Sequence, residues 1–237
     1  MVYGDLHIHS CYSNGYFKNF PPWVASTPKQ ILEKAKKVGL KVVAIADHDS
    51  LKGSQEAAKL ASGFGVIVVP ACEITSLEGH ILAYGIKKEI PKKLKASKTI
   101  NLIHKQGGLA VAAHPFRVRL PIFDGIGLYR LVFCLPFDGL EVANASQPLK
   151  ANKIALKAIR NDGLRVAQVG GSDSHVLDFI GYGRTIFKNK IKTADDVLQA
   201  IRSQQTEAKV VKYILSWQKY LTTFRDQFKS LPHFILR

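Results

Sequence analysis

The 237-residue chain is predicted to be an α/β protein in which a parallel sheet and its crossover helices form a barrel-like arrangement. Short apolar runs of strand length alternate with helix-like segments, which is the pattern of repeated βαβ units. Histidine and acidic residues repeatedly follow these apolar runs. Because the active sites of barrels lie at the carboxyl ends of their strands, this placement favours a barrel.

The first half of the chain divides into predicted strands and helices. Residues 2–9 are predicted to form a strand. A helix is predicted to begin at Thr27-Pro28 and to end at Gly39, because proline suits a first helical turn and glycine follows a last one. The later elements are a strand over 41–46, a helix over 53–62, a strand over 65–71 that leads to Glu73, a strand over 80–86, a helix capped by Ser97 that reaches about residue 106, and a strand over 108–113.

The second half continues this alternation. Strands are predicted over 139–143, 165–169 and 183–187, and helices over 149–161 and from Thr193, whose first turn carries acids that the helix dipole favours. Residues 117–136 are expected to form a loop with a short helix. From about residue 208, apolar side chains at helical spacing predict an amphipathic C-terminal helix: Val211, Ile214, Leu215, Leu221, Phe224 and Phe228. We therefore expect a barrel domain over 1–205 and a helical extension over 206–237.

Composition limits the class of protein. No segment approaches the roughly 20 apolar residues that cross a bilayer, and the first residues lack the basic and apolar stretches of a secretory leader. The sequence therefore predicts a cytoplasmic protein with no membrane partner. Its three cysteines, Cys11, Cys72 and Cys134, are an odd number without close pairing, which argues against a disulfide framework. Cys11 and Cys72 are expected to be buried structural thiols and not metal ligands.

The chain is strongly basic. Lysine and arginine number 34 against 18 acidic residues, a formal net charge of +16. Such a charge attracts polyanions, including nucleic acid and phosphorylated metabolites. The alternative interpretation is that the lysines solvate the outer faces of helices.

Histidines and acids with metal-ligand spacing carry the chemistry of the sequence. His7 and His9, like Asp173 and His175, are two residues apart, and residues i and i+2 of a strand point to the same side. Each pair can therefore direct two ligand atoms into one pocket. Imidazole with carboxylate suits zinc, manganese or iron at hydrolytic sites, and the candidates exceed what one ion needs. The further candidates are His48, Glu73, His80 and His114.

Six motifs in order resemble those of the polymerase and histidinol phosphatase (PHP) superfamily. They are Asp5-Leu6-His7-Ile8-His9-Ser10, Ala46-Asp47-His48-Asp49, Glu73-Ile74-Thr75, Gly79-His80-Ile81-Leu82, Ala113-His114-Pro115 and Gly171-Ser172-Asp173-Ser174-His175. The resemblance spans about residues 1 to 187. It implies a distorted TIM-like (β/α)7 barrel, with a metal site at the carboxyl ends of its strands and an activity on phosphoesters.

The resemblance also implies how the ligands are shared. His7, His9, Glu73 and Asp173 would hold a first ion. Glu73 would bridge to a second ion, completed by His80 and His114, and a third would use His48 and His175. Asn14 stands where related members carry a ligand aspartate, and an amide oxygen is the weaker ligand. We therefore expect two or three divalent ions of zinc, manganese or iron.

The predicted activity is hydrolysis of a phosphate ester through a metal-bridging hydroxide, with a small phosphomonoester or a nucleotide as substrate. Arg117 is similar to a family arginine that faces the substrate phosphate. Asp47 or His175 could protonate the leaving group, although Asp47 could instead orient a histidine or cap a turn. Three alternatives stay open: a nuclease acting on oligonucleotides, a metal hydrolase acting on another bond, and a nucleic-acid-binding subunit without activity.

Overall fold

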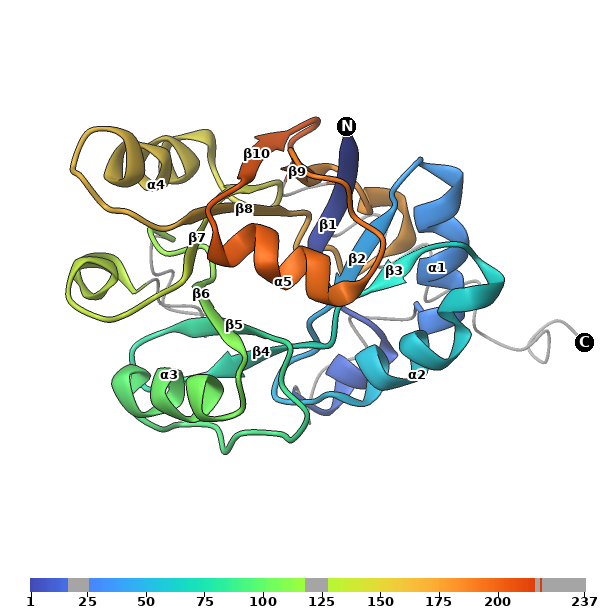
Figure 1. Ribbon diagram of the computed structural model, residues 1–237, viewed down its shortest axis with the longest axis horizontal. Coiled ribbons are helices and arrows are strands. Elements are labelled where there is room, and N and C mark those ends of the chain that lie inside the picture. The colour runs from blue at the N-terminus through green and yellow to red at the C-terminus, as the bar shows by residue number, and fades with distance from the viewer. Residues whose placement is uncertain (17–25, 118–127, 216–217, 219–237) are drawn as a thin grey trace, which may run out of the picture.

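The computed structural model describes residues 1–16, 26–117, 128–215 and 218. Within them the chain forms two five-stranded sheets flanked by helices (Figure 1). One sheet has the order β10 (Thr206–Val210), β9 (Gly183–Phe187), β1 (Val2–Ile8), β2 (Val42–Ile45) and β3 (Ile67–Val68). The other has the order β4 (Ala71–Thr75), β5 (His80–Tyr84), β6 (Leu109–Ala112), β7 (Gly139–Asn144) and β8 (Ala167–Gly171). The predicted α/β class is confirmed.

The helices are α1 (Pro28–Lys37), α2 (Lys52–Leu60), α3 (Ala96–Lys105), α4 (Leu149–Arg160) and α5 (Ala194–Arg202), with the 3-10 turns η1 (Cys11–Tyr16), η2 (Ala61–Gly63), η3 (Tyr129–Phe133) and η4 (Leu177–Phe179). Four of these helices flank the sheets, and the fifth, α5, lies across the middle of the view and covers the layer between them (Figure 1). None of the helices in the described ranges is long and apolar enough to cross a membrane.

Helix starts follow the sequence where a side chain can cap them. Thr27 and Thr193 each accept a hydrogen bond from the third residue of their helix, and both form capping boxes. The predicted cap at Ser97 is wrong, because α3 already begins at Ala96. The carboxylate of Glu78 takes the place of a local cap, since it accepts a hydrogen bond from the amide of Ala96 at 2.7 Å.

Buried side chains form three layers around the sheets. Residues of β1, β2 and β3 pack against α1 and α2, and residues of β4 to β7 pack against α3 and α4. The layer between the sheets combines inward-facing residues of both with the apolar face of α5. There the hydroxyl of Tyr84 donates to the carbonyl of Leu6 at 2.8 Å. Strands buried on both faces explain why the predicted strands are nearly continuous apolar runs.

The sheets are mixed, so the prediction of one parallel sheet is wrong for part of the fold. The pairs β1–β2, β2–β3, β6–β7 and β7–β8 are parallel, whereas β4–β5, β5–β6, β1–β9 and β9–β10 are antiparallel. Only residues 76–79 join β4 to β5. A connection this short closes a hairpin and cannot carry the helix that a parallel crossover needs.

The described residues form no closed barrel, which corrects the predicted (β/α)7 arrangement. The two sheets are linked by isolated bridges between Ile8 and Ser174 and between His48 and Glu73. The predicted strand over 65–71 is divided into β3 and β4, which belong to different sheets. Pro70 lies at the break, where its missing N–H cannot join a ladder. The sheets therefore separate where one continuous strand was expected.

Residues 206–210 form β10, so the predicted C-terminal helix does not begin at residue 208. β10 pairs with β9 from Thr206 to Val210, and its exposed Glu207 and Lys209 alternate with more buried neighbours. That period of two belongs to a strand. The rest of the predicted helix, including Leu221, Phe224 and Phe228, lies outside the described residues. The division of the chain at residue 205 stays a prediction.

Candidate metal centre

The eight predicted ligand residues converge where the two sheets meet. His7 lies on β1, Glu73 on β4 and His80 at the start of β5, while the others follow the ends of β1, β2, β6 and β8: His9, His48, His114, Asp173 and His175. The two bridges between the sheets also lie here. Backbone hydrogen bonds hold the junction, from the His9 amide to the Ser174 carbonyl at 2.9 Å and from the Asp173 amide to the His7 carbonyl at 2.8 Å.

Four ligand atoms surround one point. The Nε2 atoms of His7 and His9 are 3.2 Å apart. Each lies 3.4 Å from Oε2 of Glu73, and Oδ1 of Asp173 is 3.8 Å from His7 Nε2 and 3.4 Å from His9 Nε2. Bonds of about 2.0–2.1 Å to a tetrahedral zinc ion place its ligand atoms about 3.3–3.4 Å apart. These spacings therefore fit one small divalent cation.

The second oxygen of Glu73 faces another pair of histidines. Its Oε1 lies 3.0 Å from Nδ1 of His80 and 3.1 Å from Nε2 of His114. Three buried atoms in this cluster make no hydrogen bond of regular geometry among the described residues: Glu73 Oε2, His80 Nδ1 and His114 Nδ1. The first two face ion-pair partners, His48 Nδ1 and Glu73 Oε1, each at 3.0 Å. A buried polar atom that makes no regular hydrogen bond is costly, so such atoms mark a place for another partner. A bound cation would satisfy the Glu73 and His80 atoms, so the donor set fits metal binding.

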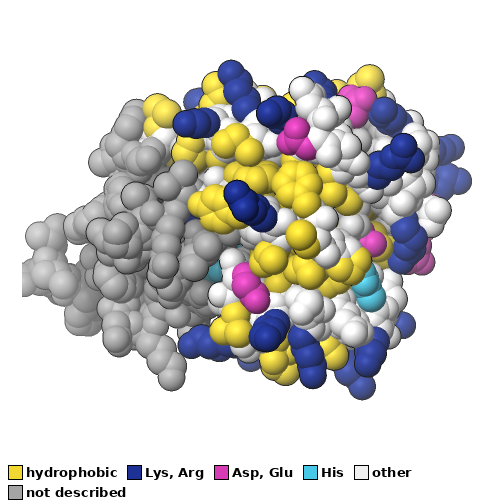
Figure 2. Space-filling model, turned by 90° about the vertical axis from the view of Figure 1, so that its left-hand side faces the viewer, with side chains coloured by type: hydrophobic (Ala, Val, Ile, Leu, Met, Phe, Trp, Pro, Cys, Tyr) yellow, Lys and Arg dark blue, Asp and Glu magenta, His cyan; other side chains and the backbone are white. Residues whose placement is uncertain are grey.

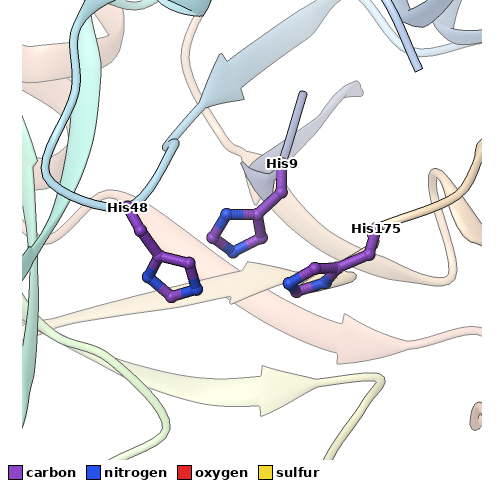
Figure 3. A group of neighbouring side chains, drawn as sticks. All are labelled: His9, His48 and His175. Atoms are coloured by element: carbon purple, nitrogen blue, oxygen red, sulfur yellow. The ribbon is translucent and has the colours of Figure 1, made fainter. Parts of the chain in front are cut away.

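A third group joins the site to solvent. His9, His48 and His175 extend from three separate segments and turn their rings toward one another (Figure 3). The His9 ring centroid is 4.5 Å from that of His48 and 4.3 Å from that of His175. His7 is fully buried, whereas the side chain of His175 is 34% exposed. The cluster is thus closed at His7 and open at His175.

Charges in the cluster favour metal-binding forms. Burial alone would raise the pKa values of Glu73 and Asp173, but the neighbouring imidazoles outweigh it and hold both well below their ordinary values. Burial lowers the pKa values of His9 and His80. Ionised carboxylates and neutral imidazoles are the forms that ligate metals.

Two histidines differ from these. Burial alone would lower the pKa of His48, but the carboxylates of Glu73 and Asp173 outweigh it and raise that pKa. The effect is larger at His7. Burial alone would lower its pKa, but the carboxylates of Glu141, Glu73 and Asp173 outweigh it and hold the pKa well above the ordinary value. Three carboxylates surround this one buried imidazole, and buried negative charges are stable only when they are paired with positive charge, which a bound cation would supply.

Two of the predicted ligand residues carry backbone strain. His114 has φ of 28° and Asp173 has φ of 52°, both in the left-handed region that side chains other than glycine rarely adopt. Such conformations cost about 1–3 kcal/mol each and cluster at functional sites. Hydrogen bonds at both amides, to Glu141 at 2.7 Å and to the His7 carbonyl, help to hold them.

Asp47 is connected to the cluster through Ser10 and Ser13. Its buried carboxylate accepts hydrogen bonds from the amide and hydroxyl of Ser10, both at 2.6 Å, and from the hydroxyl of Ser13 at 2.8 Å. The same Ser13 oxygen is 3.1 Å from Nδ1 of His9. These contacts connect Asp47 to a predicted ligand histidine through one hydroxyl, which agrees with the orienting role, one of the alternatives that the sequence left open.

Arg117 is half-buried, three residues beyond His114. Its amide donates to the His114 carbonyl at 3.0 Å, and its own carbonyl accepts the hydroxyl of Tyr129 at 2.5 Å. No acidic group in the described ranges forms an ion pair with its guanidinium. The side chain of Asn14, in contrast, lies outside the described part of the chain.

Two buried residues of the cluster were not predicted from the sequence. Glu141, in β7, accepts from Nδ1 of His7, and Asn144 donates to Oδ2 of Asp173 at 3.4 Å. The available signal was a carboxylate within the apolar run over 139–143, since a buried charge needs a partner. Asp5, by contrast, bonds to backbone amides of His7, Ser172 and Gly181.

The chain is similar in sequence to one family model and to an archaeal protein. A family model described as PHP-associated matches residues 150–206. An uncharacterized protein of Methanocaldococcus jannaschii is 43% identical over 143 residues, which cover 60% of this chain and 81% of that protein.

Solved structures share the fold. A two-domain protein of Bacteroides vulgatus containing a predicted PHP-like metal-dependent phosphoesterase gives a TM-score of 0.68 at 18% identity, over 88% of this chain and 64% of that one. A lesion-specific endonuclease of Pyrococcus furiosus gives 0.57 at 21% identity, over 88% and 57%. This chain spans less than two thirds of either protein.

Proposed function

Because the chain belongs to the PHP superfamily, we propose that its histidine and carboxylate cluster binds two or three divalent transition-metal ions and hydrolyses phosphate esters. The single observation that carries this proposal is the group formed by His7, His9, Glu73 and Asp173. Five of the distances between their four ligand atoms are 3.2–3.8 Å, and all four side chains are buried. No ordinary packing requirement brings two imidazoles and two carboxylates to one point.

The candidate ligands would hold up to three neighbouring ions, two of which share Glu73. Glu73 directs Oε2 at His7 and His9 and Oε1 at His80 and His114, so one carboxylate would serve two ions. His48 and His175 would contribute to a third with His9. Zinc, manganese and iron all suit this nitrogen and oxygen donor set. When bound, such ions lower the pKa of water and offset the charge of a phosphoryl group.

The protein itself would bind and orient the substrate. A phosphate ester would approach on the side of His175, the most exposed histidine of the cluster. Arg117 is placed three residues from the ligand His114, and its fork of donors matches two phosphate oxygens. His175 would donate a proton to the leaving oxygen if it is not a ligand. Asp47 would act through Ser13 on the orientation of His9.

We propose a small phosphate ester or nucleotide as the primary substrate, because metal ions held by this cluster would contact a single phosphate group. The +16 charge favours a second candidate, the hydrolysis of oligonucleotides. Lysine and arginine side chains outnumber acidic ones on the face in Figure 2, where they surround an apolar area. The likeness to a lesion-specific endonuclease supports the same alternative.

A substrate screen of the full chain tests the proposal. Protein loaded separately with zinc, manganese or iron would be assayed on phosphomonoesters, a phosphodiester, nucleotides and short oligonucleotides. We expect phosphate-ester hydrolysis that a chelator abolishes and that one of these metals restores. Metal-loaded protein that hydrolyses none of these compounds would contradict the phosphoesterase assignment, and preferred cleavage of oligonucleotides would replace the primary candidate by the second.

A further inference from the structure

Glu141 is a fully buried carboxylate that contacts a ligand histidine from the side opposite to the centre. Its Oε1 accepts a hydrogen bond from Nδ1 of His7 at 2.9 Å. Its Oε2 accepts from the backbone amide of His114 at 2.7 Å and from Nδ2 of Asn144 at 3.0 Å. Glu141 therefore joins residues that follow or lie on β1, β6 and β7.

We propose that Glu141 is a positioning residue that sets the tautomer and orientation of the His7 ring for metal binding. This inference rests on the proposed function only in requiring that the cluster binds a metal ion. An imidazole that ligates through Nε2 must carry its proton on Nδ1, and a carboxylate at Nδ1 selects that form and fixes the ring. Nε2 of His7 then faces Glu73 and Asp173, as the distances of 3.4 Å and 3.8 Å show.

The hydrogen bonds of Glu141 require an acceptor at both carboxylate oxygens, which the amide of a glutamine cannot supply. Oε2 meets two donors, the His114 amide and the Asn144 side chain. The orientation of Asn144 is fixed because its Oδ1 accepts from the amide of Ser146 at 2.8 Å. A glutamine must keep its oxygen toward these donors, so its amide group would face Nδ1 of His7. His7 would then have to accept at Nδ1 and carry its proton on Nε2, the atom needed for the metal.

Glu141 also supports a second ligand. His114 has φ of 28°, and its amide hydrogen bond to Glu141 holds this left-handed turn at the end of β6. One carboxylate thus orients a ring on one sheet and a backbone turn on the other, and both belong to the proposed centre.

Metal affinity tests the inference without an activity assay. We would measure zinc binding to the wild-type chain and to Glu141→Gln by competition with a chromophoric chelator. We expect the variant to bind zinc at the tightest site about 10–100-fold more weakly, the range found for carboxylates behind ligand histidines. Unchanged affinity in the folded variant would overturn the inference.

Asp5→Asn is the matched control. Asp5 is another fully buried carboxylate, on the same strand as His7, but it accepts from backbone amides. Its substitution should lower the melting temperature while zinc affinity changes by less than about tenfold. An equal loss of affinity in both variants would show that general loosening is the cause, and would also overturn the inference.

A spectroscopic measurement covers the case in which Glu141→Gln does not fold. In the zinc-loaded wild-type chain, ¹⁵N spectra of the histidine rings should show the proton of His7 on Nδ1 and no proton on Nε2. A proton on Nε2 would overturn the inference. If the wild-type chain bound no zinc, manganese or iron, the proposed function would fail first, which keeps the two failures distinct.

Discussion

Glu73→Gln is the substitution from which we expect the largest effect, because five imidazoles surround this one carboxylate. Its Oε2 lies 3.4 Å from Nε2 of His7 and of His9 and 3.0 Å from Nδ1 of His48. Its Oε1 lies 3.0 Å from His80 and 3.1 Å from His114. Glutamine preserves the shape but replaces one oxygen by an amide group and removes the negative charge. Whichever way the amide turns, one group of histidines loses its shared oxygen.

We therefore expect the variant to lose at least one metal ion per chain. The rate of ester hydrolysis should fall about a hundredfold or more, which is about 2.7 kcal/mol in activation free energy and is comparable to the loss of one major electrostatic contact. Elemental analysis of the purified chain and initial rates at saturating substrate measure the two effects.

Glu78→Gln is the matched control for this substitution. Glu78 lies in the turn between β4 and β5, where its carboxylate binds the first amide of α3 instead of a histidine. The control should keep its metal content and its rate. Full metal content and full activity in Glu73→Gln would refute the assignment of Glu73 as a shared ligand.

Three further outcomes follow from the contacts. Gly53→Ala would place a Cβ atom against the carboxylate of Asp47 and the hydroxyl of Ser10, so its free energy of unfolding should fall by about 1–3 kcal/mol. Gly63→Ala meets nothing within 4 Å and should stay near wild type, and equal denaturation midpoints for the two variants would contradict the packing. Ser13→Ala removes the oxygen between Asp47 and His9 and should weaken zinc binding about tenfold; unaltered binding would exclude orientation through Ser13. The KM for an oligonucleotide should rise steeply with salt while that for a nucleotide changes little, and a flat response for both would leave the +16 charge without a role in substrate binding.

The convergence of the ligands could be predicted because each lies at or near the end of an apolar run. The i, i+2 spacing of His7 and His9 required a strand, and β1 supplies it. Thr27 and Thr193 marked helix starts because their hydroxyls cap free amides at short range. Such local signals do not depend on which strands pair.

Long-range pairing was the part that the sequence left undecided. The run over 65–71 has the composition of one buried strand, yet Pro70 divides it between two sheets. The predicted helix began at about residue 208, but the ladder to β9 makes residues 206–210 a strand. Glu141 was missed because its partner, His7, is 134 residues away in sequence. A contact of that kind leaves no periodic pattern.

Metal content of the wild-type chain tests the central claim most directly. Protein purified without chelator, or reconstituted with zinc, manganese or iron, would be analysed for bound metal per chain. The arrangement of His7, His9, Glu73 and Asp173, with the neighbouring histidines, predicts about two or three ions. Less than about one ion per chain after reconstitution would contradict the account, because four converging ligand atoms should retain at least one.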